Sequence, residues 1–162
     1  MQRVLRLFWF IPLALTASGT LAAELTRADV ESTLKAAPAG QGARFSGQSL
    51  ARLDLHDLDF TGADLSATDL SDADLRGAKL VGAKLVGAKL PRVRLNLAWI
   101  MRADFSHADL SDAVLETLVV SAGLETHPEE AASFVGANLS GAKVIARFSL
   151  DDMRGANLSH VR

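Results

Sequence analysis

The chain has 162 residues, no cysteine and a formal net charge of −2. Without cysteine the protein has no disulfides, no thiolate nucleophile and no cysteine-ligated zinc, and so small a net charge does not indicate a nucleic-acid partner. The length fits a single domain, because one repeat occupies most of the chain.

The N-terminal segment has the layout of a secretory signal peptide: residues 1–23 read MQRVLRLFWFIPLALTASGTLAA. A basic start precedes an apolar run from Leu7 to Ala17, and small residues follow it. This run is short for a membrane span, which needs about 20 residues. We therefore predict an exported protein, periplasmic or secreted, cleaved after Ala22 or Ala23, with no membrane contact beyond the signal peptide. The alternative is an uncleaved membrane anchor.

Residues 24–42 are predicted to form a short N-terminal helix. Thr26 and Asp29 have the spacing of a capping box, with Asp in place of the usual Glu. Val30 and Leu34 follow four residues apart, on one face of a helix. Because a solenoid exposes the apolar end of its first unit, we expect this helix to cap the repeat that follows. A partner-binding helix is the alternative.

From Phe45 to Val120 a large apolar residue stands at every fifth position, usually with alanine two residues ahead of it. On an α-helix, residues five apart differ in direction by about 140°, so they would share no face. On a flat strand, an odd spacing sends alternate side chains to opposite faces. The spacing therefore predicts short extended pieces separated by corners, with the chain coiled around its own apolar side chains. Glycines two residues after the apolar positions fit such corners.

The repeat resembles that of the pentapeptide-repeat family. Its motifs are Ala-Asp-Leu at 63–65, 73–75 and 108–110 and Ala-Asn-Leu at 137–139 and 156–158. The resemblance implies an all-β solenoid, a right-handed quadrilateral parallel β-helix with four pentapeptides per coil. Residues 43–162 would then form about five to six coils.

The spacing alone does not distinguish four pentapeptides per coil from three, but the charges favour four. An offset of 20 residues stacks mostly opposite charges on adjacent coils, about 4.8 Å apart. Asp64 with Lys84 and Asp69 with Lys89 are two such pairs. One like pair remains, Asp54 with Asp74.

The repeat is interrupted once and shifted once. After Val120 the next apolar position in phase is Phe134, so the acidic, proline-containing segment at about 121–131 is predicted to be a surface loop. The repeat then resumes and slips by one residue after Val144. We therefore expect the last coils to continue the solenoid beyond the loop.

No pattern for catalysis, cofactor binding or metal binding is found. The carboxylates stand on an open wall, whereas general acid–base catalysis needs an enclosed site that shifts the pKa. No histidine has a second ligand at metal spacing; the four are His56, His107, His127 and His160. We therefore expect no catalytic, cofactor-binding or metal-binding residues and no enzyme.

The resemblance also suggests one activity, the protection of topoisomerases from poisons by a β-helix that mimics DNA in shape and negative charge. Two features argue against this alternative, antibiotic-resistance function. An exported protein would not meet a cytoplasmic topoisomerase. Between acidic stretches at 54–74 and 104–116 lies a basic band, formed by Lys79, Lys84, Lys89, Arg92, Arg94 and Arg102.

The preferred function is a non-catalytic protein-interaction or scaffold module of the cell envelope. With four faces per coil, a group of apolar residues falls at outward positions of adjacent coils, and exposed apolar clusters mark contacts. The candidate interaction patch consists of Val81, Trp99, Met101, Val114 and Val119. We expect either an unidentified protein partner or self-association as a homodimer to cover it; the alternative is that the 121–131 loop folds over it.

Overall fold

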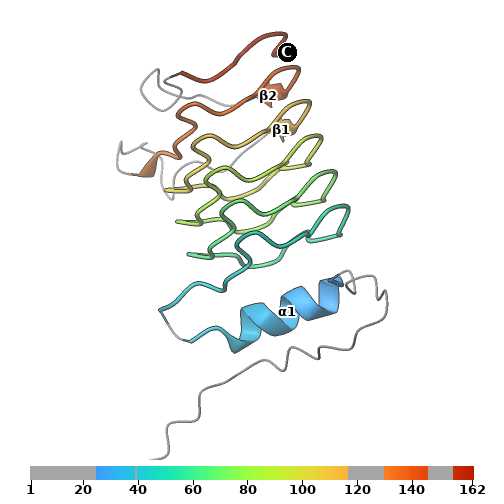
Figure 1. Cartoon of the computed structure of the whole chain (residues 1–162), viewed down its shortest axis with the longest axis vertical. Helices are drawn as coiled ribbons and strands as arrows, with labels where there is room; N and C mark the ends of the chain where they lie inside the picture. The colour runs from blue at the N-terminus through green and yellow to red at the C-terminus, as the bar shows by residue number, and fades with distance from the viewer. Residues whose placement is uncertain (1–24, 39, 117–129, 146–154) are drawn as a thin grey trace, which may run out of the picture.

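The computed structural model describes residues 25–38, 40–116, 130–145 and 155–162. The predicted signal peptide at 1–23, nearly all of the predicted loop at 121–131 and the patch residue Val119 lie outside these ranges. The described chain forms helix α1 (Arg27–Ala36) and a stack of coils above it (Figure 1). The two strands β1 (Val114–Glu116) and β2 (Lys143–Ile145) pair in parallel within this stack.

Each complete coil contains four pentapeptides. Parallel bridges connect residues 20 apart, from Arg44 with Asp64 to Arg94 with Val114. The offset rises to 29 residues at Asp104 and Ser133, because nine residues (29 − 20) are inserted there without changing the later pairing. It is 19 between Asn138 and Asn157, the one-residue slip that the sequence predicts. The predicted total of five to six coils extends over residues outside the described ranges.

The core is the column of apolar residues inside the coils. The described leucines and phenylalanines of the five-residue series up to Leu139 are almost completely buried, and so are most alanines two positions earlier; Leu158, near the C-terminus, is 50% exposed. Leu85, in the middle of the stack, has no exposed surface. Phe105 and Phe134 stack with ring centroids 4.9 Å apart, so the core is continuous across the inserted segment.

The hydrogen bonds of one pentapeptide explain how the coils hold together. The N–H groups of the central leucine and of the second corner residue donate to the next coil, and the N–H before the leucine donates to the preceding coil. The N–H of the first residue in the pentapeptide donates to the carbonyl of the preceding central residue and closes the turn between them. In residues 63–67 these bonds are Leu65 to Lys84 O (2.7 Å), Ala67 to Val86 O (2.9 Å), Asp64 to Ala43 O (2.8 Å) and Ala63 to Phe60 O (2.9 Å).

The second corner residue adopts positive φ wherever the corner is described, as the third residue of a type II turn requires. Glycine adopts this conformation without strain, as at Gly82 and Gly87, both with φ of 65°. Several corners nevertheless carry side chains, including Leu97 at φ 61° and Asp72 at φ 60°. The predicted corners are therefore confirmed, but glycine is not required at each of them.

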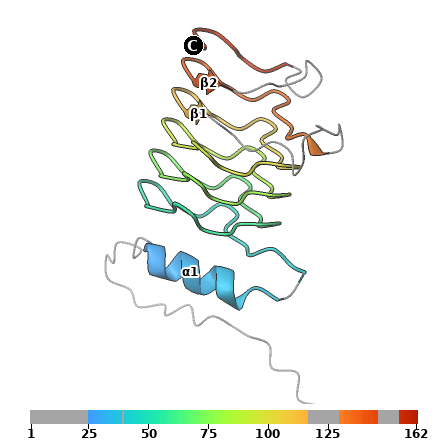
Figure 2. The same ribbon diagram turned by 180° about the vertical axis from the view of Figure 1, so that it is seen from behind.

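Helix α1 lies across the N-terminal end of the stack, as both views show (Figures 1 and 2). The Thr26 hydroxyl accepts from the Asp29 N–H, and the Asp29 carboxylate accepts from the Thr26 N–H, which is the reciprocal capping box. Val30 is fully buried in the same apolar cluster as Phe45 and Leu50. Within the described residues, no helix combines the length and apolar character that crossing a membrane requires.

Candidate functional site

Two large apolar side chains stand exposed on one coil of the stack. Trp99 is 41% exposed and Leu97 is 56% exposed. Trp99 continues an outward column whose preceding members are Asp59 and Lys79. Val81, one coil earlier, is half-buried, and so is Val114 on the neighbouring face. We call Val81, Leu97, Trp99 and Val114 the Trp99 surface.

Met101 does not belong to this surface. The sequence places Met101 at an outward position and predicts an exposed side chain, but Met101 is only 7% exposed, so the predicted exposure is wrong. Its column continues on both sides: the Gly82 N–H donates to Met101 O (2.8 Å), and the Arg102 N–H donates to Glu130 O (2.9 Å). The repeat position gives the direction of a side chain but not the neighbours on the coils that flank it. The fifth predicted residue, Val119, lies outside the described residues.

Leu97, at the corner that precedes Trp99, extends the candidate patch. It occupies a corner with positive φ, where a β-carbon costs about 1–2 kcal/mol relative to glycine. More than half of its side chain is exposed, so the core does not bury it. The signal in the sequence is a large apolar residue at the corner position, where the first coils carry mainly glycine or charged residues.

Asp and Asn before the central leucine have a local role that the sequence reasoning missed. Their side chains accept the one N–H of the pentapeptide that the coils leave unused. Asp69 Oδ1 accepts from the Ser71 N–H (3.0 Å) and hydroxyl (2.6 Å). The Ser71 hydroxyl, followed by its N–H, lowers the pKa of Asp69. Lys89 cannot accept a hydrogen bond, and the residue at the equivalent position of its pentapeptide is Pro91, which has no N–H.

Charges stacked between coils are secondary to this local bond. Ion pairs form between Lys79 and Asp59 (3.5 Å), and between Arg94 and Asp74 (3.4 Å), all of them at least partly exposed to solvent. The signs alternate along two of the four columns, as in Asp64, Lys84 and Asp104. The described wall is therefore not the continuous acidic surface that DNA mimicry needs.

We expect Asp69→Ala to destabilise the protein by about 1 kcal/mol, and Lys89→Ala to change stability by less than about 0.5 kcal/mol. Only the first change removes an acceptor from a backbone N–H. Urea denaturation at pH 7 measures both. Because the pKa of Asp69 is lowered by folding, its contribution is complete above the ordinary value of about 4 and disappears as the pH falls through the lowered value. The difference between wild type and Asp69→Ala should shrink accordingly. A loss above about 2 kcal/mol in Lys89→Ala would show that this lysine is desolvated.

The described residues contain no group of three His, Cys, Asp or Glu side chains that could hold a metal ion. His56 contacts the carboxylate of Asp54, and the His107 ring occupies the space beside Gly136. A hollow of about 520 Å³ between α1 and the first coil is lined by Glu31, Leu34, Lys35, Leu58 and Asp59. Its lining has no nucleophilic side chain beside a base, so it suggests no acyl-transfer chemistry.

The repeat is matched by a known family. Residues 41–66, 59–96 and 78–116 match pentapeptide repeats, in eight copies. No curated protein matches the chain.

Solved structures of pentapeptide repeat proteins are also similar to the chain. Rfr23 from the cyanobacterium Cyanothece 51142 is 22% identical with a TM-score of 0.35, over 75% of this chain and 56% of that chain. A protein from Nostoc PCC 7120 is 25% identical with a TM-score of 0.37, over 84% and 93%. QnrB1, a plasmid-mediated fluoroquinolone resistance protein, is 18% identical with a TM-score of 0.28, over 76% and 75%. The chain thus spans little more than half of the Cyanothece protein.

Proposed function

Because residues 41–116 belong to the pentapeptide-repeat family, we propose that the protein is a non-catalytic interaction module of the cell envelope. It is exported by its N-terminal signal peptide and binds a protein partner, or a second copy, through the Trp99 surface. The regular β-helix acts as a rigid support that displays this surface.

The exposure of Trp99 is the observation that carries this proposal. In a solenoid the outward position before the central residue is normally polar, and here the same column carries Asp59 and Lys79. Tryptophan is among the residues most enriched in the energetically important centres of interfaces. With Leu97 exposed two residues earlier, the coil presents an apolar area that its own core does not use.

The test begins with the protein recovered from the producing cell. Export predicts an N-terminus near Glu24 and recovery in the envelope or medium; an intact Met1 in a membrane fraction would contradict export. The recovered protein is then cross-linked in intact cells and its mass is followed by sedimentation over a range of concentrations. A partner or a second copy should be captured.

Two variants locate the contact, each of which introduces a charge beside an existing opposite charge. Trp99→Glu places a carboxylate beside Lys79, so the coil should remain folded while binding is lost. Ile145→Lys is the matched control: it replaces another exposed apolar residue of the stack with a charge next to Glu116, and it should leave binding unchanged. Equal cross-linking and sedimentation of wild type and Trp99→Glu would contradict the assignment of this surface.

A further inference from the structure

The first coil of a parallel β-helix has carbonyl groups that no preceding coil can use. In the stack, carbonyls on each side of a central residue accept from N–H groups of the coil before. On the face that contains β1, the Leu55 N–H donates to Asp74 O (2.8 Å) and the Asp57 N–H donates to Arg76 O (2.9 Å). The equivalent carbonyls of the first coil are those of Asp54 and His56.

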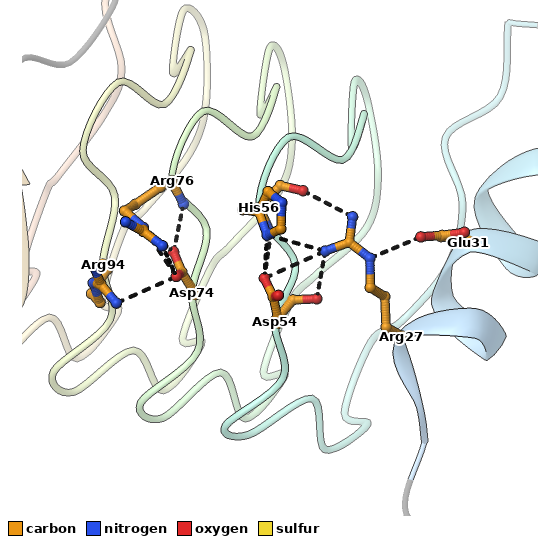
Figure 3. Close-up of polar contacts among 7 residues, drawn as sticks. All are labelled: Arg27, Glu31, Asp54, His56, Asp74, Arg76 and Arg94. Carbon is orange, nitrogen blue, oxygen red and sulfur yellow. Dashed lines mark hydrogen bonds and ion pairs between the residues drawn. The ribbon is translucent and has the colours of Figure 1, made fainter.

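Arg27 of α1 supplies both missing donors. Its NH1 donates to Asp54 O (2.9 Å) and its NH2 donates to His56 O (3.1 Å), as Figure 3 shows. The two nitrogens of one planar guanidinium thus take the place of two backbone N–H groups two residues apart. The Nε of Arg27 donates to Glu31 (2.8 Å), one turn later on the same helix, which fixes the orientation of the group.

The same side chain also compensates a local excess of negative charge. Asp54 stacks on Asp74, the like-charged pair in this column. Asp74 is bound by Arg76 (2.7 Å) and Arg94 (3.4 Å), both visible in Figure 3. Asp54 has Arg27 at 3.4 Å as its cationic neighbour and also contacts the His56 ring. Arg27 therefore satisfies the carbonyls and the carboxylate of the first coil together.

The rest of the first edge depends on α1 as a cover. The other three faces of the first coil also have carbonyls that face the N-terminal end of the stack. No described residue donates a hydrogen bond to these carbonyls, which belong to Arg44, Ser46, Ser49, Ala51, Asp59 and Thr61. An open strand edge is a template for pairing with another chain. Helix α1 lies over this end, with Val30 in the core, and so stands in the path of a second backbone (Figure 1).

We propose that α1 shields the N-terminal edge from pairing with a second copy of the protein, and that Arg27 is the residue that holds α1 in place. A second copy is the best matched partner, because its coils before the insertion have the same perimeter of 20 residues and its bridged residues pair in parallel throughout the described stack. Such a partner can engage several faces of the edge together, whereas an isolated extended peptide engages one.

The test compares Arg27→Ala, Arg27→Lys and Lys35→Ala in the purified protein, each in a Trp99→Glu background. The background removes association through the Trp99 surface, so the two proposals are tested separately. Arg27→Lys keeps the charge but lacks the fork that reaches both carbonyls. Lys35→Ala removes a cation from the same helix, where its side chain is 80% exposed and lies 3.9 Å from Glu31.

Sedimentation over a hundredfold concentration range is the measurement, with far-UV circular dichroism to show that the coils remain folded. We expect a constant mass for the background and for Lys35→Ala, and a mass that rises with concentration for both Arg27 variants. If Arg27→Ala does not fold, Arg27→Lys decides the result. A constant mass in a folded Arg27 variant would overturn the proposal, and so would association of Lys35→Ala to the same extent.

Discussion

Leu85→Asp is expected to leave the protein largely unfolded. Leu85 is completely buried in the middle of the stack, between the coils that contribute Leu65 and Phe105. An aspartate there would place a carboxyl group among apolar side chains, at a cost of several kcal/mol even when it is protonated. Total stabilities of domains are about 5–15 kcal/mol. Far-UV circular dichroism and urea denaturation would measure the loss.

Leu97→Asp is the matched control for this prediction. It is the same substitution less than one coil later, but at a side chain that is 56% exposed and at a backbone with positive φ, which Asp tolerates better than Leu. Stability should therefore be unchanged or slightly higher. If Leu85→Asp retained wild-type stability, or if both variants lost stability equally, the inward and outward assignments of the repeat would be wrong.

Gly42→Ala is expected to have the second largest effect, about 3 kcal/mol. A β-carbon at Gly42 would overlap the carbonyl group of Gly62 on the next coil, and both are backbone atoms that cannot turn away. The first coil and α1 would have to shift relative to the rest of the stack. Thermal denaturation, with proteolysis at the N-terminal end as a local readout, would measure this.

Gly87→Ala separates this overlap from the ordinary cost of replacing glycine. A β-carbon at Gly87 would contact nothing within 4 Å, but φ is 65° there. Only the torsional cost of about 1 kcal/mol is expected. If Gly42→Ala cost no more than Gly87→Ala, the close approach of Gly42 to Gly62 would not limit the packing of the first two coils.

The coil could be predicted from the sequence because its signal is periodic. A spacing of five residues excludes a regular helix and a flat strand, and charges at an offset of 20 residues favour the observed stacking of Asp64 and Asp69 on their lysine neighbours. The capping box at Thr26 likewise depends only on two residues three positions apart. These features depend on local spacing or on a constant offset, so they can be predicted without knowledge of the tertiary contacts.

The candidate site was harder to predict because it depends on neighbours that are not periodic. Met101 is covered although its position points outward, and Leu97 is exposed at a corner that usually holds smaller or polar residues. The role of Asp69 was assigned to the lysine on the next coil, whereas its main partner is Ser71, two residues away. The two carbonyls bound by Arg27 were not predictable, because nothing in the sequence fixes where α1 lies on the first coil.

The constant offset between bridged residues also determines the order in which the molecule can fold. Each coil before the insertion closes a loop of the same length, about 20 residues, whatever its place in the chain. The entropic cost of closing a loop depends on its length, so the first closure is made without a template and each later one adds to an edge that already exists. Folding can therefore advance coil by coil as a zipper, and a chain that emerges gradually from its N-terminus can begin before the rest has appeared.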